Sequence, residues 1–208
     1  MRTRIKFCGC RTARDVENAV VAGADAVGFV LARSRRSITV TDARRLLPLV
    51  PPSLLAVAVF VEATLPEVEP LLEMRSDLAL QVTRLGKSIA QLPPVNVIQT
   101  VHVAADDDSN AVEIALSASD AHQILYDTRI GATAGGTGRS FDWNLILPVV
   151  HRRPSFVAGG LTPGNVGRCI RLLRPYGVDV SSGIETCGTK DPKRMRNFVD
   201  AVRAVDED

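Results

Sequence analysis

The feature that most constrains the fold of this chain is a regular alternation between short apolar runs and segments of helical periodicity. The runs are rich in β-branched residues, and each precedes a segment whose apolar residues recur every three or four positions. This pattern occurs eight times. It predicts strands at residues 5–8, 26–31, 55–61, 78–82, 96–103, 123–127, 156–158 and 178–181, and helices at residues 12–22, 41–50, 65–74, 88–92, 110–118, 143–151, 164–173 and 192–205.

Strands that are apolar along their whole length are buried on both faces, and parallel strands need helical crossovers. Eight such units without an obvious linker favour closure into a barrel. We therefore predict an α/β fold, a (β/α)8 TIM barrel, as a single catalytic domain spanning residues 1–208, with a short fourth helix. No Gly-x-Gly-x-x-Gly follows the first strand, which disfavours a dinucleotide-binding sheet.

Composition excludes several classes of protein. Apolar residues make up 46% of the 208 residues and the net charge is +2, without a basic stripe, so neither disorder nor a nucleic-acid partner is expected. The longest apolar runs, such as residues 54–61, are too short to span a membrane, and the start resembles no secretion signal. The cysteines are widely spaced, which favours reduced thiols in the cytoplasm over disulfides or a zinc site. They are Cys8, Cys10, Cys169 and Cys187.

Two glycine-containing segments indicate a phosphate site. In a barrel of this kind the active site lies at the carboxyl ends of the strands, and the loops after strands 7 and 8 frequently bind phosphate. Gly159 and Gly160 follow the seventh predicted strand, while Ser181, Ser182 and Gly183 follow the eighth. Either loop alone could consist of ordinary turn residues, but both together favour phosphate binding by backbone N–H groups.

Cys8 and Asp127 are the candidate catalytic pair. Each ends a predicted strand, so each is expected at the barrel mouth, where the two side chains could act as base and acid. A lone cysteine is more often a buried structural thiol. A carboxylate at a strand end is either a loop cap or a functional acid.

A glycine-rich stretch at residues 131–138 follows the sixth predicted strand. Loops of this length are usually functional or disordered, so we expect a lid over the substrate rather than a plain connection. The lid residues are Gly135, Gly136, Thr137 and Gly138.

Several strings of residues, in this order, resemble the phosphoribosylanthranilate isomerase family over nearly the whole chain. The most specific are Gly-Gly-Thr-Gly-x-x-Phe-Asp-Trp at residues 135–143 and Val-Asp-Val-Ser-Ser-Gly-x-Glu at residues 178–185. Shorter matches are Lys-Phe-Cys-Gly at residues 6–9, Gly-Ala-Asp-Ala-Val-Gly-Phe at 23–29, Ser-Arg-Arg at 34–36, Val-Phe-Val at 59–61, Ala-Gly-Gly-Leu-Thr-Pro-Gly-Asn-Val at 158–166 and Lys-Asp at 190–191.

The resemblance implies an acid/base Amadori rearrangement of N-(5-phosphoribosyl)anthranilate to a 1-deoxyribulose 5-phosphate, in tryptophan biosynthesis. It implies that Cys8 is the general base, that Asp127 is the general acid and that Arg36 holds the substrate carboxylate. Gln81 and Asp179 would be further substrate contacts. The only partner expected is the phosphorylated substrate, with no cofactor, no metal and no protein partner.

The proposed chemistry sets requirements on two pKa values. A thiol base needs a pKa somewhat below the usual value of about 8.5, and a carboxylic acid donor needs a raised pKa, which an apolar strand end can supply by desolvation.

The fourth strand departs from the family pattern. The family has Gln-Leu-His-Gly at this strand end, whereas this chain has Gln-Val-Thr-Arg at residues 81–84. Two alternatives therefore stay open, a related isomerase that acts on a different phosphoribosyl amine and a non-catalytic barrel. Retention of Cys8 and Asp127 argues against the second.

Overall fold

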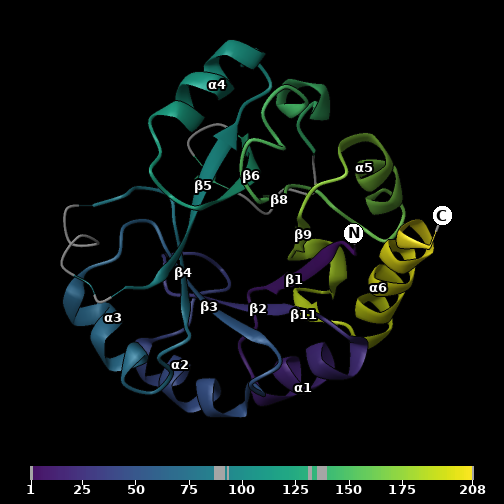
Figure 1. Cartoon of the computed structure of the whole chain (residues 1–208). Coiled ribbons are helices and arrows are strands. Elements are labelled where there is room, and N and C mark those ends of the chain that lie inside the picture. Colours follow the sequence, from purple (N-terminus) through teal and green to yellow (C-terminus); the bar gives the residue numbers. More distant parts are fainter. Residues whose placement is uncertain (1, 87–91, 93, 131–132, 135–139, 208) are drawn as a thin grey trace.

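The computed structural model describes residues 2–86, 92, 94–130, 133–134 and 140–207. Within them, eight parallel strands form a ring with helices around its outside, as Figure 1 shows along the axis of the barrel. Pairing between β5 and β6 closes the ring. The strands are β1 (Arg4–Cys8), β2 (Ala26–Val30), β3 (Leu55–Phe60), β4 (Ala79–Val82), β5 (Asn96–Val103), β6 (Gln123–Ile130), β8 (Ser155–Val157) and β9 (Gly177–Val180). The predicted (β/α)8 barrel is thus confirmed.

The helices lie close to their predicted positions, with shifted ends. They are α1 (Ala13–Ala22), α2 (Val40–Leu46), α3 (Leu65–Leu72), α4 (Ser109–Ser117), α5 (Val166–Leu173) and α6 (Pro192–Asp206), with the 3-10 helices η1 (Leu47–Leu49), η3 (Trp143–Ile146) and η4 (Ser182–Ile184). The predicted short fourth helix at residues 88–92 falls almost entirely outside the described residues.

Two helix predictions were wrong in detail. Helix α2 begins at Val40 rather than at residue 41, because Thr39 caps it. The Thr39 hydroxyl accepts a hydrogen bond from the N–H of Asp42, whose carboxylate accepts one from the N–H of Thr39. The helix predicted at residues 143–151 is only the short η3, followed by turns.

Two small sheet additions were not predicted. Strand β7 (Thr133–Ala134) pairs antiparallel with the end of β6. A hairpin of β10 (Glu185–Thr186) and β11 (Thr189–Lys190) lies between β9 and α6. Both lie after the carboxyl end of a barrel strand, so both add to the mouth of the barrel.

The apolar core has two parts. A large cluster fills the layer between the strands and the helices, where Phe7 on β1 meets Phe198 on α6 edge to face at a ring distance of 6.2 Å. A smaller cluster lies on the opposite, inward faces of the strands and includes Val57, Ile98 and Leu125. This inner cluster closes one end of the barrel, and polar side chains occupy the inward positions toward the other end.

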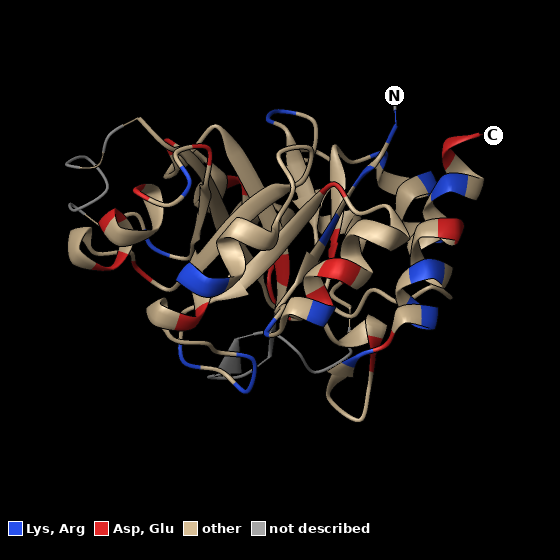
Figure 2. Ribbon diagram, turned by 90° about the horizontal axis from the view of Figure 1, so that it is seen from below, with Lys and Arg blue, Asp and Glu red and all other residues tan. Residues whose placement is uncertain are grey.

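Positively and negatively charged residues are interspersed along the helices on the side that Figure 2 shows. No helix of the described residues is long and apolar enough to cross a membrane.

Candidate active site

Cys8 lies at the end of β1 and faces the inside of the barrel. Because side chains alternate along a strand, Lys6 shares this inward face while Phe7 faces the helices. Gly28 on β2 is the register partner of Cys8. A Cβ atom at Gly28 would lie 3.0 Å from Cys8 Sγ and 3.2 Å from Lys6 Nζ, so glycine leaves the space that both side chains occupy.

Lys6 is fully buried and forms an ion pair with Asp179 on β9, with 2.7 Å between Nζ and Oδ1. The two residues are register partners across β1 and β9. Burial lowers the pKa of Lys6, but the charges of Asp179 and Cys8 outweigh it and raise the pKa above its usual range. A charged lysine therefore stands beside the candidate base.

The pKa of Cys8 is set mainly by burial. Burial raises it above its usual value, and the nearby charge of Lys6 opposes the shift without reversing it. The barrel by itself therefore does not supply the downward shift that a thiol base needs, because only 8% of the Cys8 surface is exposed and desolvation dominates.

Asp127 lies within β6 rather than at its end, since the strand continues to Ile130 and pairs there with β7. Burial raises the pKa of Asp127 to about 6 and the charge of Asp179 adds to the shift, while the Thr128 N–H and Lys6 oppose it. Thr128 N–H donates to Asp127 Oδ1 at 2.8 Å. A carboxyl group with this pKa can hold a proton near neutrality, as an acid donor must.

Arg36 is not a solvated arginine. Only 8% of its surface is exposed, and its guanidinium donates two hydrogen bonds to Glu185 on β10, at 2.6 Å from Nε and 2.8 Å from Nη2. Lys190 on β11 lies 3.0 Å from the same carboxylate. Burial alone would raise the pKa of Glu185, but Arg36 and Lys190 lower it to about 2. The hairpin thus fixes Arg36 at the barrel mouth.

The two predicted phosphate loops come together in the fold. Gly159 and Gly160 both have positive φ, at 83° and 64°. A Cβ at Gly159 would overlap Thr128, and a Cβ at Gly183 would overlap the carbonyl oxygen of Leu161 in the neighbouring loop. These close approaches require glycine and bring backbone groups of both loops to one place.

Ser181 joins the second loop to β1, since its hydroxyl donates to the carbonyl oxygen of Cys8 at 2.9 Å. Lys190 Nζ donates to the carbonyl oxygen of Ser181 at 3.1 Å. Ser182 begins η4 directly after it. The loop after β9 is therefore tied both to the candidate base and to the hairpin.

Gln81 on β4 faces the interior and donates from Nε2 to Thr100 Oγ1 at 3.1 Å. Its Oε1 is buried and has no hydrogen-bond partner among the residues that the structure describes. The predicted lid residues lie outside the described residues: Gly135, Gly136, Thr137 and Gly138.

Asn165 was missed as a functional residue, although it lies in a string that resembles the family. Its Oδ1 accepts from the N–H of Thr162 at 2.8 Å, and its Nδ2 donates to the carbonyl oxygen of Gly160 at 2.9 Å. It therefore holds the loop after β8 in shape. The signal available in the sequence was an asparagine at the start of the helix predicted at residues 164–173.

The Phe-Asp-Trp string at residues 141–143 has a structural role in the described contacts. Phe141 N–H donates to Thr128 Oγ1 at 3.1 Å, Asp142 caps η3, and the Trp143 ring lies 5.6 Å from the guanidinium of Arg168. These contacts attach the segment after β7 to β6 and α5.

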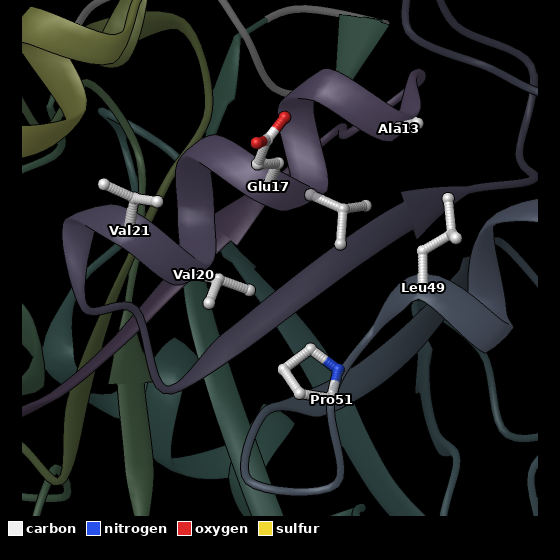
Figure 3. Close-up of a pocket in the computed structure, with 7 residues that line it drawn as sticks. Ala13, Glu17, Val20, Val21, Leu49 and Pro51 are labelled. Carbon is white, nitrogen blue, oxygen red and sulfur yellow. The ribbon is translucent and has the colours of Figure 1, made fainter.

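A separate apolar hollow of about 450 Å³ lies outside the barrel, between α1 and η1 (Figure 3). Val20, Val21, Leu49 and Pro51 line it, with Glu17 as its one charged residue. Polar groups do not converge there, so the barrel mouth remains the candidate site. Among the described residues, no group of three or more His, Cys, Asp or Glu side chains could hold a metal ion.

A closed parallel barrel whose mouth holds a buried thiol, a carboxyl group of raised pKa and two glycine loops defines the class: a (β/α)8-barrel enzyme that works by proton transfer. A family model described as N-(5'phosphoribosyl)anthranilate (PRA) isomerase matches residues 5–201. The chain therefore belongs to the phosphoribosylanthranilate isomerase family, as its sequence strings predict.

Individual relatives agree with this assignment. The N-(5'-phosphoribosyl)anthranilate isomerase of Desulforudis audaxviator is 39% identical over 97% of this chain and 98% of its own, and that of Streptococcus pneumoniae is 38% identical over 97% and 96%. The crystal structure of phosphoribosyl anthranilate isomerase from Thermotoga maritima has a TM-score of 0.84 at 34% identity, covering 97% of this chain and 99% of that one.

One solved relative holds a ligand. A phosphoribosyl anthranilate isomerase in complex with reduced 1-(o-carboxyphenylamino)-1-deoxyribulose 5-phosphate is 33% identical, with a TM-score of 0.80 over 97% of this chain and 99% of that one. Family and neighbours together confirm the predicted function, an isomerase of tryptophan biosynthesis.

Proposed function

We propose that this chain isomerises N-(5-phosphoribosyl)anthranilate with Asp127 as general acid and Cys8 as general base. The observation that carries these roles is the raised pKa of Asp127, about 6, in a barrel interior where a charged lysine stands beside Cys8. An acid whose pKa is raised toward neutrality and a thiol next to a cation are two groups suited to an aldose-to-ketose rearrangement.

The reaction proceeds in three steps. Asp127 donates its proton to the ribose ring oxygen, the bond from that oxygen to C1 breaks, and the nitrogen lone pair forms an iminium. The Cys8 thiolate then removes the proton from C2, and the electrons of that C–H bond form the double bond of an enolamine. The enolamine tautomerises to the ketone, and proton exchange with solvent restores the thiolate and the carboxylic acid.

Arg36 binds the anthranilate carboxylate in this proposal. The two hydrogen bonds to Glu185 use Nε and Nη2, so Nη1 is the group assigned to the substrate. The pair with Glu185 holds the guanidinium plane in one orientation before substrate arrives, which reduces the entropy lost on binding.

The phosphate lies against the loops formed by Gly159, Gly160, Ser181, Ser182 and Gly183. The close packing of Gly183 against the carbonyl oxygen of Leu161 supports this, because it brings the backbones of the two loops together.

Further substrate contacts come from two inward-facing residues and one loop. Gln81 offers the buried Oε1 that has no partner among the described residues, and Asp179 lies at the same end of the barrel. The predicted lid at residues 135–138 would close over them. No cofactor, metal or protein partner is required by this mechanism, and we place the single 208-residue domain in the cytoplasm, where its free thiols stay reduced.

A different phosphoribosyl amine is the second candidate substrate, because the rim at the end of β4 has changed. Arg84 lies there, largely exposed, 3.9 Å from Glu62, and Thr83 stands where the family has histidine. A more polar aglycone would fit a rim with these side chains. A barrel without catalytic activity is disfavoured, since the raised pKa of Asp127 serves no structural purpose.

The test is turnover of N-(5-phosphoribosyl)anthranilate by the purified chain, beside Cys8→Ser and Asp127→Asn. Cys187→Ser is the matched control, because this thiol is exposed on the hairpin. We expect turnover in the wild type and the control, and losses of about 10²- to 10⁴-fold in each active-site variant. Wild-type protein that fails on this substrate but turns over another phosphoribosyl amine would establish the second candidate instead.

A further inference from the structure

Lys6 occupies an unusual position for a lysine. It lies in the middle of β1, fully buried, among strand residues whose other buried members are apolar. A buried ammonium group costs several kcal/mol unless it is paired, and Asp179 supplies the pair at 2.7 Å. A well-packed apolar residue would fill the same space at similar or lower cost in stability. Lys6 has no role in the mechanism described so far.

The ion pair lies between the two groups that exchange protons with substrate. On one side, Lys6 Nζ and Cys8 Sγ lie within 3.2 Å of one point beside Gly28. On the other side, Asp179 belongs to β9, two strands along the ring from β6, which carries Asp127. The charges of Lys6 and Asp179 both act on Cys8 and on Asp127.

We propose that the Lys6–Asp179 ion pair is a positioning pair that biases the two catalytic groups toward opposite protonation states. Lys6, the nearer member for Cys8, stabilises the thiolate. Asp179, the stronger influence on Asp127, stabilises the protonated acid. The inference rests on the proposed function and adds to it an oriented pair of charges that acts on base and acid in opposite directions.

The orientation follows from where each charge lies. Lys6 Nζ and Cys8 Sγ lie 3.2 and 3.0 Å from one point beside Gly28, whereas Asp179 is on β9, one strand nearer than β1 to β6, which carries Asp127. Next to burial, Lys6 has the larger effect on Cys8 and lowers its pKa, while Asp179 has a smaller, raising effect. At Asp127 the order is reversed, so that Asp179 raises the pKa more than Lys6 lowers it. A single salt bridge therefore favours a deprotonated base and a protonated acid at once, which is the combination the first two steps require.

Other charged groups around the pair act in addition. Lys190 on β11 lowers the pKa of Cys8, and Arg36 also interacts with the Cys8 charge. His102 on β5 is the register partner of Asp127. These groups stay in place in the variants below, so a change in Cys8 ionisation on removing Lys6 or Asp179 reports on the pair.

The test measures how fast iodoacetamide alkylates Cys8 at a fixed pH near neutrality, read by mass spectrometry of the Cys8 peptide. It compares wild type with Lys6→Met, Asp179→Asn and the double variant. Only the thiolate reacts, so the rate follows the thiolate fraction, which changes about tenfold for each unit of pKa. A thiol of lower pKa is also a weaker nucleophile, and this cancels roughly half of the change in the logarithm of the alkylation rate.

We expect alkylation about threefold or more slower in Lys6→Met and faster by a similar factor in Asp179→Asn. If Lys6→Met does not fold, the double variant decides, because it leaves no unpaired buried charge. It should react more slowly than wild type, since Lys6 has the larger effect on Cys8. A structural role alone predicts no change, or the same direction in both single variants, and either result overturns the proposal.

The acid gives a second readout. In Asp179→Asn the ionisation of Asp127 that the pH profile of kcat/KM reports should move to lower pH. An Asp127 ionisation that stays in place would overturn the Asp127 half of the inference. The alkylation assay needs no substrate. If the two single variants shift the alkylation rate in opposite directions but the wild type does not turn over phosphoribosylanthranilate, the proposed function is contradicted and the electrostatic role of the ion pair is not.

Discussion

The inside of the barrel and the layer between its strands and helices differ sharply in chemistry, although the same strands supply both. The outer layer is continuous and apolar, with pairs such as Phe7 and Phe198. The interior is apolar at one end and polar at the other, where Lys6 and Asp179 are buried and Asp127 is half-buried. The difference indicates that the outer layer supplies stability and that the polar interior serves the reaction at some cost in stability.

The largest effect expected from this comparison is the loss of activity in Asp127→Asn. The amide cannot donate a proton to the ring oxygen, so kcat should fall by about 10²- to 10⁴-fold while the fold is kept. Steady-state kinetics measure the loss of kcat, and circular dichroism checks that the fold is kept. Asp120→Asn is the matched control, since this carboxylate is exposed. A variant that keeps more than a tenth of the activity would remove Asp127 from the mechanism.

Phe198→Ala should lower stability and leave activity almost unchanged, in contrast to Asp127→Asn. Truncating this fully buried ring leaves a cavity against Phe7 and should lower the free energy of unfolding by about 3–5 kcal/mol, measured by urea denaturation. The kcat/KM of the molecules that remain folded should stay within about twofold of wild type. Leu172→Ala, on the exposed side of α5, should cost much less. A large change in kcat/KM would contradict the division between outer layer and interior.

Asp127 should also lower stability at neutral pH. Its pKa is raised from 3.8 to about 6 in the folded state, so between these values the folded state binds more protons than the unfolded chain. Stability attributable to Asp127 is present below pH 3.8 and is lost as the pH rises through about 6. Asp127→Asn should therefore gain roughly 3 kcal/mol relative to wild type at pH 7, with the gain disappearing below pH 4. Thermal unfolding of wild type and Asp127→Asn at pH 7 and below pH 4 measures this gain. Equal stabilities of the two proteins at pH 7 would contradict a raised pKa of Asp127.

The smallest effect is expected at a helix end in the outer layer. Thr39→Ala removes the hydroxyl that accepts from the N–H of Asp42 and should cost about 1 kcal/mol of stability without changing kcat or KM. Thr39→Ser keeps the hydroxyl and should restore most of the loss. Failure of serine to rescue stability would assign the effect to the lost methyl group rather than to the cap.

Local patterns predicted most of the fold because each barrel strand is short, apolar and bounded by turn residues. The start of β2 at Ala26 and the end of β1 at Cys8 agree with the prediction. The prediction was wrong where the helical pattern was weak, as after Trp143, and where β6 continued beyond Asp127 by pairing with β7. In both cases contacts with other segments, rather than local preference, set the boundary.

The sequence by itself determined the barrel, the two glycine loops and the identities of the candidate base and acid. Only the tertiary structure showed that Lys6 pairs with Asp179, 173 residues away, and that Arg36 pairs with Glu185, 149 residues away. Closure of the ring brings β9 beside β1 and removes water from the interior. The physical reason is that a pKa depends on burial and on neighbouring charges, and neither exists until the chain has folded.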